Sequence, residues 1–313
     1  MNDSNTNLSA NAVTVLVLEG GDSPEREVSL RSAANVKDQL TALGYETRVA
    51  DPAAADFNLI AATADCDVVL PILHGEGGED GALQRQLESI GKPFLGSGSA
   101  ACELTFDKAK YREFMAEKGM LMAEGEIVTR EAFEASPLRK APYVLKPVDG
   151  GSSVDTVILH DLADEPDSGY FDELFSRYDT MLLEQLIGGQ ELTVGILGAQ
   201  ALPIILIVPP SDETFDYENK YNGRTQEIVN PSDVPAEYHQ KAKDIALQAH
   251  KLTGCRHLSR TDMILTEAGE LYVLETNTIP GLTQQSLFPK MAMAAGLDMP
   301  GLVKCFVDMA NGL

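Results

Sequence analysis

Residues 259–277 read SRTDMILTEAGELYVLETN, two short runs of strand-forming residues around a polar turn. The runs 259–265 and 271–275 are each long enough for a strand, and Gly269 supplies the flexibility that a tight connection needs. The stretch therefore predicts a β-hairpin within an α+β unit in the C-terminal part of the chain.

The register of this hairpin decides which polar side chains meet. If the turn centres between residues 268 and 269, Asp262 faces Glu275, Arg260 faces Asn277, and all four side chains share one face. Two opposed carboxylates destabilise a hairpin unless a cation lies between them. Oxygen ligands of these types suit Mg²⁺ bound to phosphates, and Arg260 could neutralise charge that develops during phosphoryl or acyl transfer. A solvated polar face explains the same pattern, but the loop 278–281 that follows, with Gly281, favours a ligand site.

The N-terminal region has a different pattern. The apolar run 13–19, VTVLVLE, predicts a buried parallel strand. Ser23 is expected to cap a helix over 24–43 that has a proline at its first position. Strands at 46–50 and 67–73 complete a βαβ pattern, which predicts a three-layer domain with loops at the carboxyl ends of its strands.

The remaining patterns predict further helices at about 80–89, 105–118 and 235–252, and strands near 126 and at 143–146, 154–159, 181–186, 191–197 and 202–208. The fold class is therefore α/β and α+β. We expect a disordered tail over 1–12, an N-terminal α/β domain over 13–104, a central domain over 105–190 and a C-terminal domain over 191–313.

Composition excludes several classes of function. The formal net charge of −24 repels nucleic-acid phosphates and anionic membranes, so no nucleic-acid partner is expected. No apolar run is long enough for a membrane span, and residues 1–12 do not resemble a signal peptide. The four cysteines form no CxxC pair and are expected to be reduced thiols of a cytoplasmic protein.

A glycine-rich loop follows the strand 143–146. Lys146 ends that strand, and Gly150, Gly151, Ser152 and Ser153 come next, so backbone N–H groups and a lysine lie where phosphate oxygens could bind. The loop is not a Walker A motif, and a merely flexible turn is the alternative. Lys108 is a second candidate cation, or a solvated helix lysine.

The segment 184–191 is a candidate nucleotide hinge. Backbone groups of 184–187 could contact an adenine edge, and Glu191 could hold ribose hydroxyls. An ordinary strand and turn is the alternative.

Nine motifs then occur in a fixed order. They are GGDSPEREVSL (20–30), LHGEGGEDG (73–81), GSG (96–98), DK (107–108), LKPVDGGSSV (145–154), LEQLIGGQELTVGIL (183–197), YENKY (217–221), SRTD (259–262) and LETNTIPGLTQQSLFP (274–289). Together they resemble the ATP-grasp enzymes and, among them, the D-alanine–D-alanine ligase family. The resemblance covers about residues 13–310 and implies a three-domain ATP-grasp architecture.

The resemblance also implies an activity. Two molecules of D-alanine would be joined through a D-alanyl phosphate, with release of ADP and phosphate, for the synthesis of peptidoglycan precursors and so for cell-wall biogenesis and cell shape. A cytoplasmic homodimer is implied as well.

Site residues follow from the same resemblance. ATP would contact Lys108, Lys146, Gly151, Ser152, Ser153, Glu184, Ile187 and Glu191. Two Mg²⁺ or Mn²⁺ ions would be held by Asp262, Glu275 and Asn277. Substrate binding would involve Glu25, His74, Lys220, Ser286 and Leu287, with Ser286 on the carboxylate of the second D-alanine. Catalysis would use Arg260, the Gly281 amide, Ser286 and a hydrogen-bonded set of Glu25, Ser152 and Tyr221.

Some positions depart from the family pattern, and some alternatives stay open. The family usually has an acidic residue where this chain has Gly150, glycine where it has Asp155, and lysine where it has Gln185. The first departure leaves the resting position of the loop open, and the other two leave the affinity for ATP open. D-lactate or D-serine could replace the second D-alanine, although Tyr221 favours the dipeptide because depsipeptide-forming relatives tend to carry Phe there. A nucleotide-binding regulator without catalysis would lack metal ligands or Arg260, and all are present.

Overall fold

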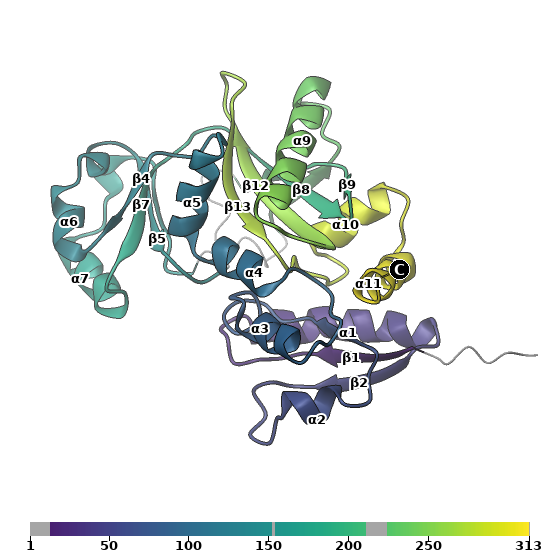
Figure 1. Cartoon of the computed structure of the whole chain (residues 1–313). Helices are drawn as coiled ribbons and strands as arrows, with labels where there is room; N and C mark the ends of the chain where they lie inside the picture. Colours follow the sequence, from purple (N-terminus) through teal and green to yellow (C-terminus); the bar gives the residue numbers. More distant parts are fainter. Residues whose placement is uncertain (1–12, 152–153, 211–223, 313) are drawn as a thin grey trace, which may run out of the picture.

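The computed structural model describes residues 13–151, 154–210 and 224–312, and three units lie around a common centre (Figure 1). The tail expected over 1–12 lies outside the described residues. No helix among the described residues is long and apolar enough to cross a membrane. The described cysteines are free thiols, and only Cys305 is partly exposed.

The N-terminal unit contains β1 (Thr14–Leu18), α1 (Arg26–Ala42), β2 (Glu46–Ala50), α2 (Leu59–Thr63), β3 (Val68–Pro71), α3 (Ala82–Ser89) and α4 (Ser99–Phe106). Its sheet has the order β2-β1-β3 and is parallel, which confirms the βαβ prediction. Apolar residues cover both faces of β1, as the continuous run of its sequence requires. On one face, the C-terminal helix α11 (Met299–Ala310) packs beside α1, so the far end of the chain completes this layer (Figure 1).

Helix α1 begins later than its sequence predicts. Ser23 does not cap it, because the Ser23 hydroxyl donates to the carbonyl of His74 (2.7 Å) and accepts from the N–H of Glu25 (3.2 Å). Glu25 occupies the N-cap position instead. The later start of α1 follows from the contact between Ser23 and His74, which are 51 positions apart in the sequence. It places the Glu25 side chain at the start of the helix.

The central unit contains α5 (Lys108–Glu117), β4 (Gly125–Val128), α6 (Arg130–Ala135), β5 (Tyr143–Pro147), β6 (Val157–Leu159), α7 (Ser168–Arg177) and β7 (Met181–Gln185), with short 3₁₀ turns at Pro137–Lys140 and Leu162–Asp164. Its antiparallel sheet has the order β4-β7-β5-β6. The helix predicted over 105–118 is in fact broken, because Asp107 is extended and caps α5 by accepting from the N–H of Lys110 (2.9 Å). Lys108 therefore stands at the first turn of α5.

The C-terminal unit contains β8 (Gln190–Leu197), β9 (Gln200–Ala201), β10 (Ile205–Val208), β11 (Gln226–Val229), α9 (Ala236–Leu252), β12 (Leu258–Leu265), β13 (Leu271–Asn277) and α10 (Leu287–Ala294). Its antiparallel sheet has the order β11-β10-β8-β12-β13, with β9 beside β8. Helix α9 buries its alanine-rich face against this sheet. The predicted mixture of α/β and α+β units is confirmed.

Candidate functional site

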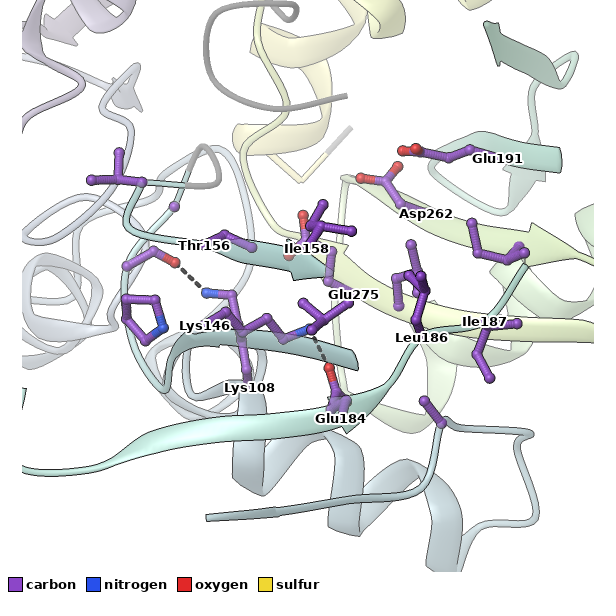
Figure 2. Close-up of a pocket in the computed structure, with 18 of the residues that line it drawn as sticks. Lys108, Lys146, Thr156, Ile158, Glu184, Leu186, Ile187, Glu191, Asp262 and Glu275 are labelled. Atoms are coloured by element: carbon purple, nitrogen blue, oxygen red, sulfur yellow. Dashed lines mark hydrogen bonds and ion pairs between the residues drawn. The ribbon is translucent and has the colours of Figure 1, made fainter. Parts of the chain in front are cut away.

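A cavity of about 910 Å³ lies where the three units meet. Its wall includes Glu25 and Gly75 from the N-terminal unit, and Lys108, Lys146 and Glu184 from the central unit, together with Glu191, Leu206, Asp262 and Glu275 from the C-terminal unit. Figure 2 shows the labelled side chains of the central and C-terminal units directed into the same space. Sites between units are common places for small-molecule ligands, and the volume suits a nucleotide.

The β12–β13 hairpin has the predicted register at the cavity. Asp262 pairs with Glu275 and Arg260 pairs with Asn277. The register shifts between Asp262 and Met263, so Leu274 is an extra residue in β13. A bulge of this kind re-aims neighbouring side chains, and both Leu274 and Glu275 line the cavity.

The four polar side chains of the hairpin share one face, as their alternation predicts. Arg260 donates to both oxygens of Asp262, from Nε (2.9 Å) and Nη2 (2.8 Å). Asn277 Nδ2 lies 3.3 Å from Asp262 Oδ2 and 3.5 Å from Glu275 Oε1. On the neighbouring strand β8, the Thr193 hydroxyl donates to Asp262 Oδ1 (2.5 Å). Asp262 is thus buried, ion-paired and fixed in orientation.

The donor atoms of this face fit a hard divalent cation. Asp262 and Glu275 offer carboxylate oxygens, and Asn277 offers an amide oxygen, which are the ligands that Mg²⁺ and Mn²⁺ prefer. Within the described ranges there is no group of three or more His, Cys, Asp or Glu that could hold a metal by itself. Mg²⁺ is usually bound by one or two carboxylates together with phosphate oxygens and water, which this face would allow.

Two lysines reach the cavity from the central unit. Lys146, at the end of β5, forms an ion pair with Glu184 of β7 at 2.6 Å (Figure 2). Lys108 Nζ donates to the carbonyl of Gly150, and the Lys108 N–H donates to the carbonyl of Val148 (2.8 Å). The break before α5 thus brings Lys108 to the glycine-rich loop. In a strongly acidic chain, these two side chains supply the local positive charge that a phosphate needs.

The strand end at β7 lines the same cavity. Glu184 lies in its wall, as do residues 185–191. The N–H of Gln185 donates to the carbonyl of Glu124 (2.8 Å), and that of Leu186 to the carbonyl of Pro142 (3.1 Å). Because these two donors are already used, recognition of a bound molecule here depends on other groups of the segment, such as the Glu184 side chain and the Ile187 backbone.

Glu25 stands where the N-terminal unit meets the glycine-rich loop. Its side chain is buried, and a β-carbon at Gly75 would come within 2.8 Å of Glu25 Oε2. Gly151 approaches the same carboxylate so closely that no side chain fits there either. Ser152 and Tyr221, the expected partners of Glu25, lie outside the described residues, as do Ser153 and Lys220.

His74 is buried and bonded through both ring nitrogens. Nδ1 lies 3.1 Å from the carbonyl of Ile279, and Nε2 lies 3.2 Å from the Ser32 hydroxyl. Because Nδ1 must donate to a carbonyl, Nε2 accepts from Ser32. Burial, with a smaller effect from Arg260, lowers the pKa of His74 to about 4, so the imidazole is neutral at physiological pH.

Glu79 is a residue of this region that the sequence did not single out. Its carboxyl group accepts from the N–H of Gly75 (2.8 Å). Burial, followed by the nearby Glu25 carboxylate, raises the pKa of Glu79 to about 8. A pair of neighbouring acidic side chains in a cleft often indicates a functional site. Glu25 and Glu79 are far apart in the sequence, so their spacing does not reveal that they form such a pair.

The loop after β13 carries the other predicted residues. A β-carbon at Gly281 would lie 2.8 Å from Ser286 Oγ, so these two residues are adjacent. Ser286 Oγ accepts from the N–H of Thr283 (3.1 Å), and Leu287 begins α10. The wall of the 910 Å³ cavity does not include His74, Arg260, Asn277, Gly281, Ser286 or Leu287, which lie beside it on the hairpin and the adjoining loops.

Comparisons with known proteins agree with this architecture. The model of the family described as "D-ala D-ala ligase C-terminus" matches residues 113–308. The D-alanine–D-alanine ligase of Rhizorhabdus wittichii is 40% identical over 301 residues, which cover 95% of this chain and 96% of the relative. That of Nitratidesulfovibrio vulgaris is 36% identical over 296 residues, covering 94% and 97%.

A solved structure gives the same result. The crystal structure of the Bacillus anthracis D-alanine–D-alanine ligase complexed with ATP superposes with a TM-score of 0.82 at 31% identity, covering 96% of this chain and 97% of that one. Sequence and fold agree over nearly the whole length of the chain. It therefore belongs to the D-alanine–D-alanine ligase family and has the ATP-grasp architecture.

Proposed function

We propose that this chain joins two molecules of D-alanine into D-alanyl-D-alanine, with conversion of ATP to ADP and phosphate, for peptidoglycan precursors. One observation carries the proposal. The cavity between the units has lysines on one side and the Asp262–Glu275 face on the other, as a phosphoryl-transfer reaction requires. The relatives from Nitratidesulfovibrio vulgaris and Rhizorhabdus wittichii are named D-alanine–D-alanine ligase. We retain the division into domains at 13–104, 105–190 and 191–313 as part of this proposal.

ATP binds in the cavity between the central and C-terminal units in this proposal. Lys108, Lys146 and the Gly151 amide contact its phosphates, with Ser152 and Ser153 completing the loop. Glu184 and the Ile187 backbone contact the adenine, and Glu191 holds the ribose. The Lys146–Glu184 ion pair supports this assignment, because it fixes a cation at the strand end beside the glycine-rich loop.

Asp262, Glu275 and Asn277 hold two Mg²⁺ or Mn²⁺ ions. When bound, the ions would neutralise part of the negative charge of the phosphates. The residues themselves have two tasks. Thr193 fixes the direction of the Asp262 carboxylate, and Arg260 pairs with both of its oxygens.

The first step forms an acyl phosphate. Glu25 binds the ammonium of the first D-alanine, and neutral His74 lies near it without adding charge. A carboxylate oxygen of this D-alanine attacks the γ-phosphorus, the bond from that phosphorus to the bridging oxygen breaks, and ADP leaves. Arg260 and the Gly281 N–H stabilise the negative charge of the product, D-alanyl phosphate.

The second step forms the peptide bond. Lys220, Ser286 and Leu287 hold the second D-alanine, with Ser286 on its carboxylate. The amine of the second D-alanine, in its unprotonated form, attacks the acyl carbon, and Arg260 and the Gly281 N–H stabilise the tetrahedral oxyanion that results. The bond from the acyl carbon to the phosphate oxygen then breaks, and phosphate leaves with the proton that the amine gives up. The set of Glu25, Ser152 and Tyr221 keeps water from the acyl phosphate. We also propose a homodimer in the cytoplasm, where ATP is available.

The test supplies the purified protein with ATP, Mg²⁺ and an acceptor panel of D-alanine, D-serine and D-lactate. The proposal predicts one phosphate released for each D-alanyl-D-alanine formed. Turnover only with D-lactate or D-serine would show a ligase of different acceptor specificity. Absence of phosphate release at all substrate concentrations and pH values would refute the proposal. Light scattering on the same sample checks the homodimer.

A further inference from the structure

Helix α1 carries a buried stripe of polar side chains. Ser29, Ser32 and Asn35 follow one another at a spacing of three and therefore lie along one face of the helix. Ser29 and Ser32 are fully buried, and Asn35 is 8% exposed. Burying a polar group is unfavourable unless it finds a hydrogen-bond partner, so this stripe must have specific partners.

The partners of Ser32 and Asn35 lie at the far end of the sequence. Asn35 Nδ2 donates to the carbonyl of Leu282 at 2.7 Å. The Ser32 hydroxyl oxygen accepts from the N–H of Leu282 at 3.2 Å. Both backbone groups of one residue in the β13–α10 loop are therefore held by two adjacent side chains of α1.

The other flank of the same loop is held from the N-terminal unit as well. The carbonyl of Ile279 accepts from His74 Nδ1 at 3.1 Å. Ser29 holds His74 in turn, because the Ser29 hydroxyl accepts from the N–H of His74 at 2.9 Å. Ile279 and Leu282 are both almost completely buried.

Between these two anchored residues lie only Pro280 and Gly281. Proline has no N–H and a fixed φ, so it adds stiffness to the segment. None of these four contacts uses the Gly281 N–H. In the proposed function, this N–H donates to the oxyanion. A donor stabilises developing charge most when it is already in place and need not reorganise.

We infer that Ser32 and Asn35 are positioning residues, which hold Leu282 and thereby fix the Gly281 N–H for the developing oxyanion. The inference rests on the proposed function, since the oxyanion arises only if an acyl phosphate is formed. A displacement of about 1 Å at such a donor is enough to lower the rate about a hundredfold.

The experiment compares Asn35→Leu and Ser32→Ala with the wild type. Asn35→Leu keeps the volume and removes only the donor to Leu282. Ser32→Ala removes the acceptor for the Leu282 N–H together with the hydroxyl that donates to His74 Nε2, so Asn35→Leu is the more specific of the two variants. Thr63→Val is the matched control, because it removes a buried hydroxyl of the same unit that bonds only within its own helix. For each variant we measure the melting temperature, kcat, KM for ATP, and inhibition by a phosphinic acid analogue of the dipeptide, whose tetrahedral phosphorus carries the negative oxygen.

We expect kcat to fall at least tenfold in Asn35→Leu and Ser32→Ala, with a matching loss of affinity for the phosphinate and a KM for ATP within threefold of the wild type. Thr63→Val should change none of these. Unchanged kcat and phosphinate affinity in either variant would overturn the inference, and so would equal losses in Thr63→Val. If Asn35→Leu does not fold, Ser32→Ala decides. A wild type that forms no dipeptide refutes the proposed function instead.

Discussion

Two loops bring backbone groups to the reaction centre, and they are held in different ways. The segment 279–282 is bonded at both flanks to buried side chains of the N-terminal unit. In the segment 147–156, the described residues 147–151 and 154–156 have exposed contacts: Lys108 bonds to Gly150, and Asp155 pairs with Arg177, whose side chain is 48% exposed. Exposed ion pairs contribute little to stability, whereas buried hydrogen bonds are costly to break.

The difference matches the tasks proposed for the two loops. A donor to an oxyanion must keep its position throughout the reaction, so an extensive buried network suits segment 279–282. A loop at the phosphates of ATP must admit and release a nucleotide in each turnover, so weak surface contacts suit segment 147–156. Changes near the first loop should therefore reduce kcat, whereas changes near the second should mainly affect KM for ATP.

The largest effect is expected at the hairpin that leads into segment 279–282. Glu275→Gln removes a proposed metal ligand, and kcat should fall by at least about a hundredfold because several kcal/mol of charge stabilisation is lost. Phosphate release measures the effect, and thermal unfolding checks the fold. Glu267→Gln, at the exposed turn of the same hairpin, is the control. Full activity of a folded Glu275→Gln would refute the metal assignment.

On the side of the second loop, Lys146→Met should act on ATP binding. The substitution keeps the apolar stem and removes the charge, and a charge-assisted hydrogen bond contributes about 1.5–3 kcal/mol, so KM for ATP should rise by about 10- to 100-fold. Initial rates over a range of ATP concentrations give this value. Lys118→Met, on the exposed lysine that follows the last residue of α5, should leave this KM unchanged. If Lys146→Met lowered kcat alone, the proposed division of labour between the loops would be wrong.

The network around segment 279–282 should also make stability depend on pH. Burial lowers the pKa of His74 to about 4, so folded His74 stays neutral while the unfolded chain takes up a proton below pH 6.5. The stability that it contributes is lost as pH falls from 6.5 to 4, by up to about 1.4 kcal/mol per pH unit. Glu79 acts in the opposite direction. Because its pKa is raised to about 8, the stability that it contributes to the fold is lost as pH rises from 4.5 to 8.

Comparison with His74→Gln separates the two contributions. The Glu79 contribution remains in both proteins and opposes that of His74 between pH 4.5 and 6.5. Urea unfolding between pH 4 and 6.5 should therefore give a slope of stability against pH that is more negative in the variant, by up to about 1.4 kcal/mol per pH unit. Parallel pH profiles would show that His74 does not keep its neutral form on folding.

The smallest effect is expected at Asp155, which stands where the family usually has glycine. Its φ of 56° is strained for a side chain, yet Asp155 pairs with Arg177 Nη1 (2.9 Å to each oxygen) and accepts from the Tyr178 hydroxyl (2.7 Å). Asp155→Gly relieves the strain and loses these half-exposed contacts, so stability should change by no more than about 1 kcal/mol. Rate assays should give a KM for ATP within threefold of the wild-type value. A tenfold change in this KM would mean that the loop is more tightly held than we infer.

Local pattern was sufficient to predict the hairpin. Alternating polarity and a glycine turn determined which residues of β12 and β13 face each other, and the structure has Asp262 opposite Glu275. The bulge at Leu274 was not predictable, because it depends on how β13 lies in the sheet and against its neighbours. The metal role of this face, in contrast, rests on the family resemblance and stays a proposal.

Other features depend on contacts between distant residues. Ser23 would cap α1 if it were not bonded to His74, and the partner of Asn35 lies 247 residues away. The stripe of Ser29, Ser32 and Asn35 was visible as polar residues on a helix, but only the fold shows what they bind. Lys146 was predicted from the glycine-rich loop that follows it, whereas the phosphate role of Lys108 came from the family resemblance; both residues line the cavity.

The central claim is that the carboxylate of the first D-alanine is activated as an acyl phosphate. Its most direct test uses D-alanine labelled with ¹⁸O in both carboxylate oxygens, together with ATP and Mg²⁺, and mass spectrometry of the released phosphate. Our account predicts one ¹⁸O in each phosphate released, because the attacking carboxylate oxygen leaves with the phosphoryl group. Dipeptide formed with unlabelled phosphate would contradict it.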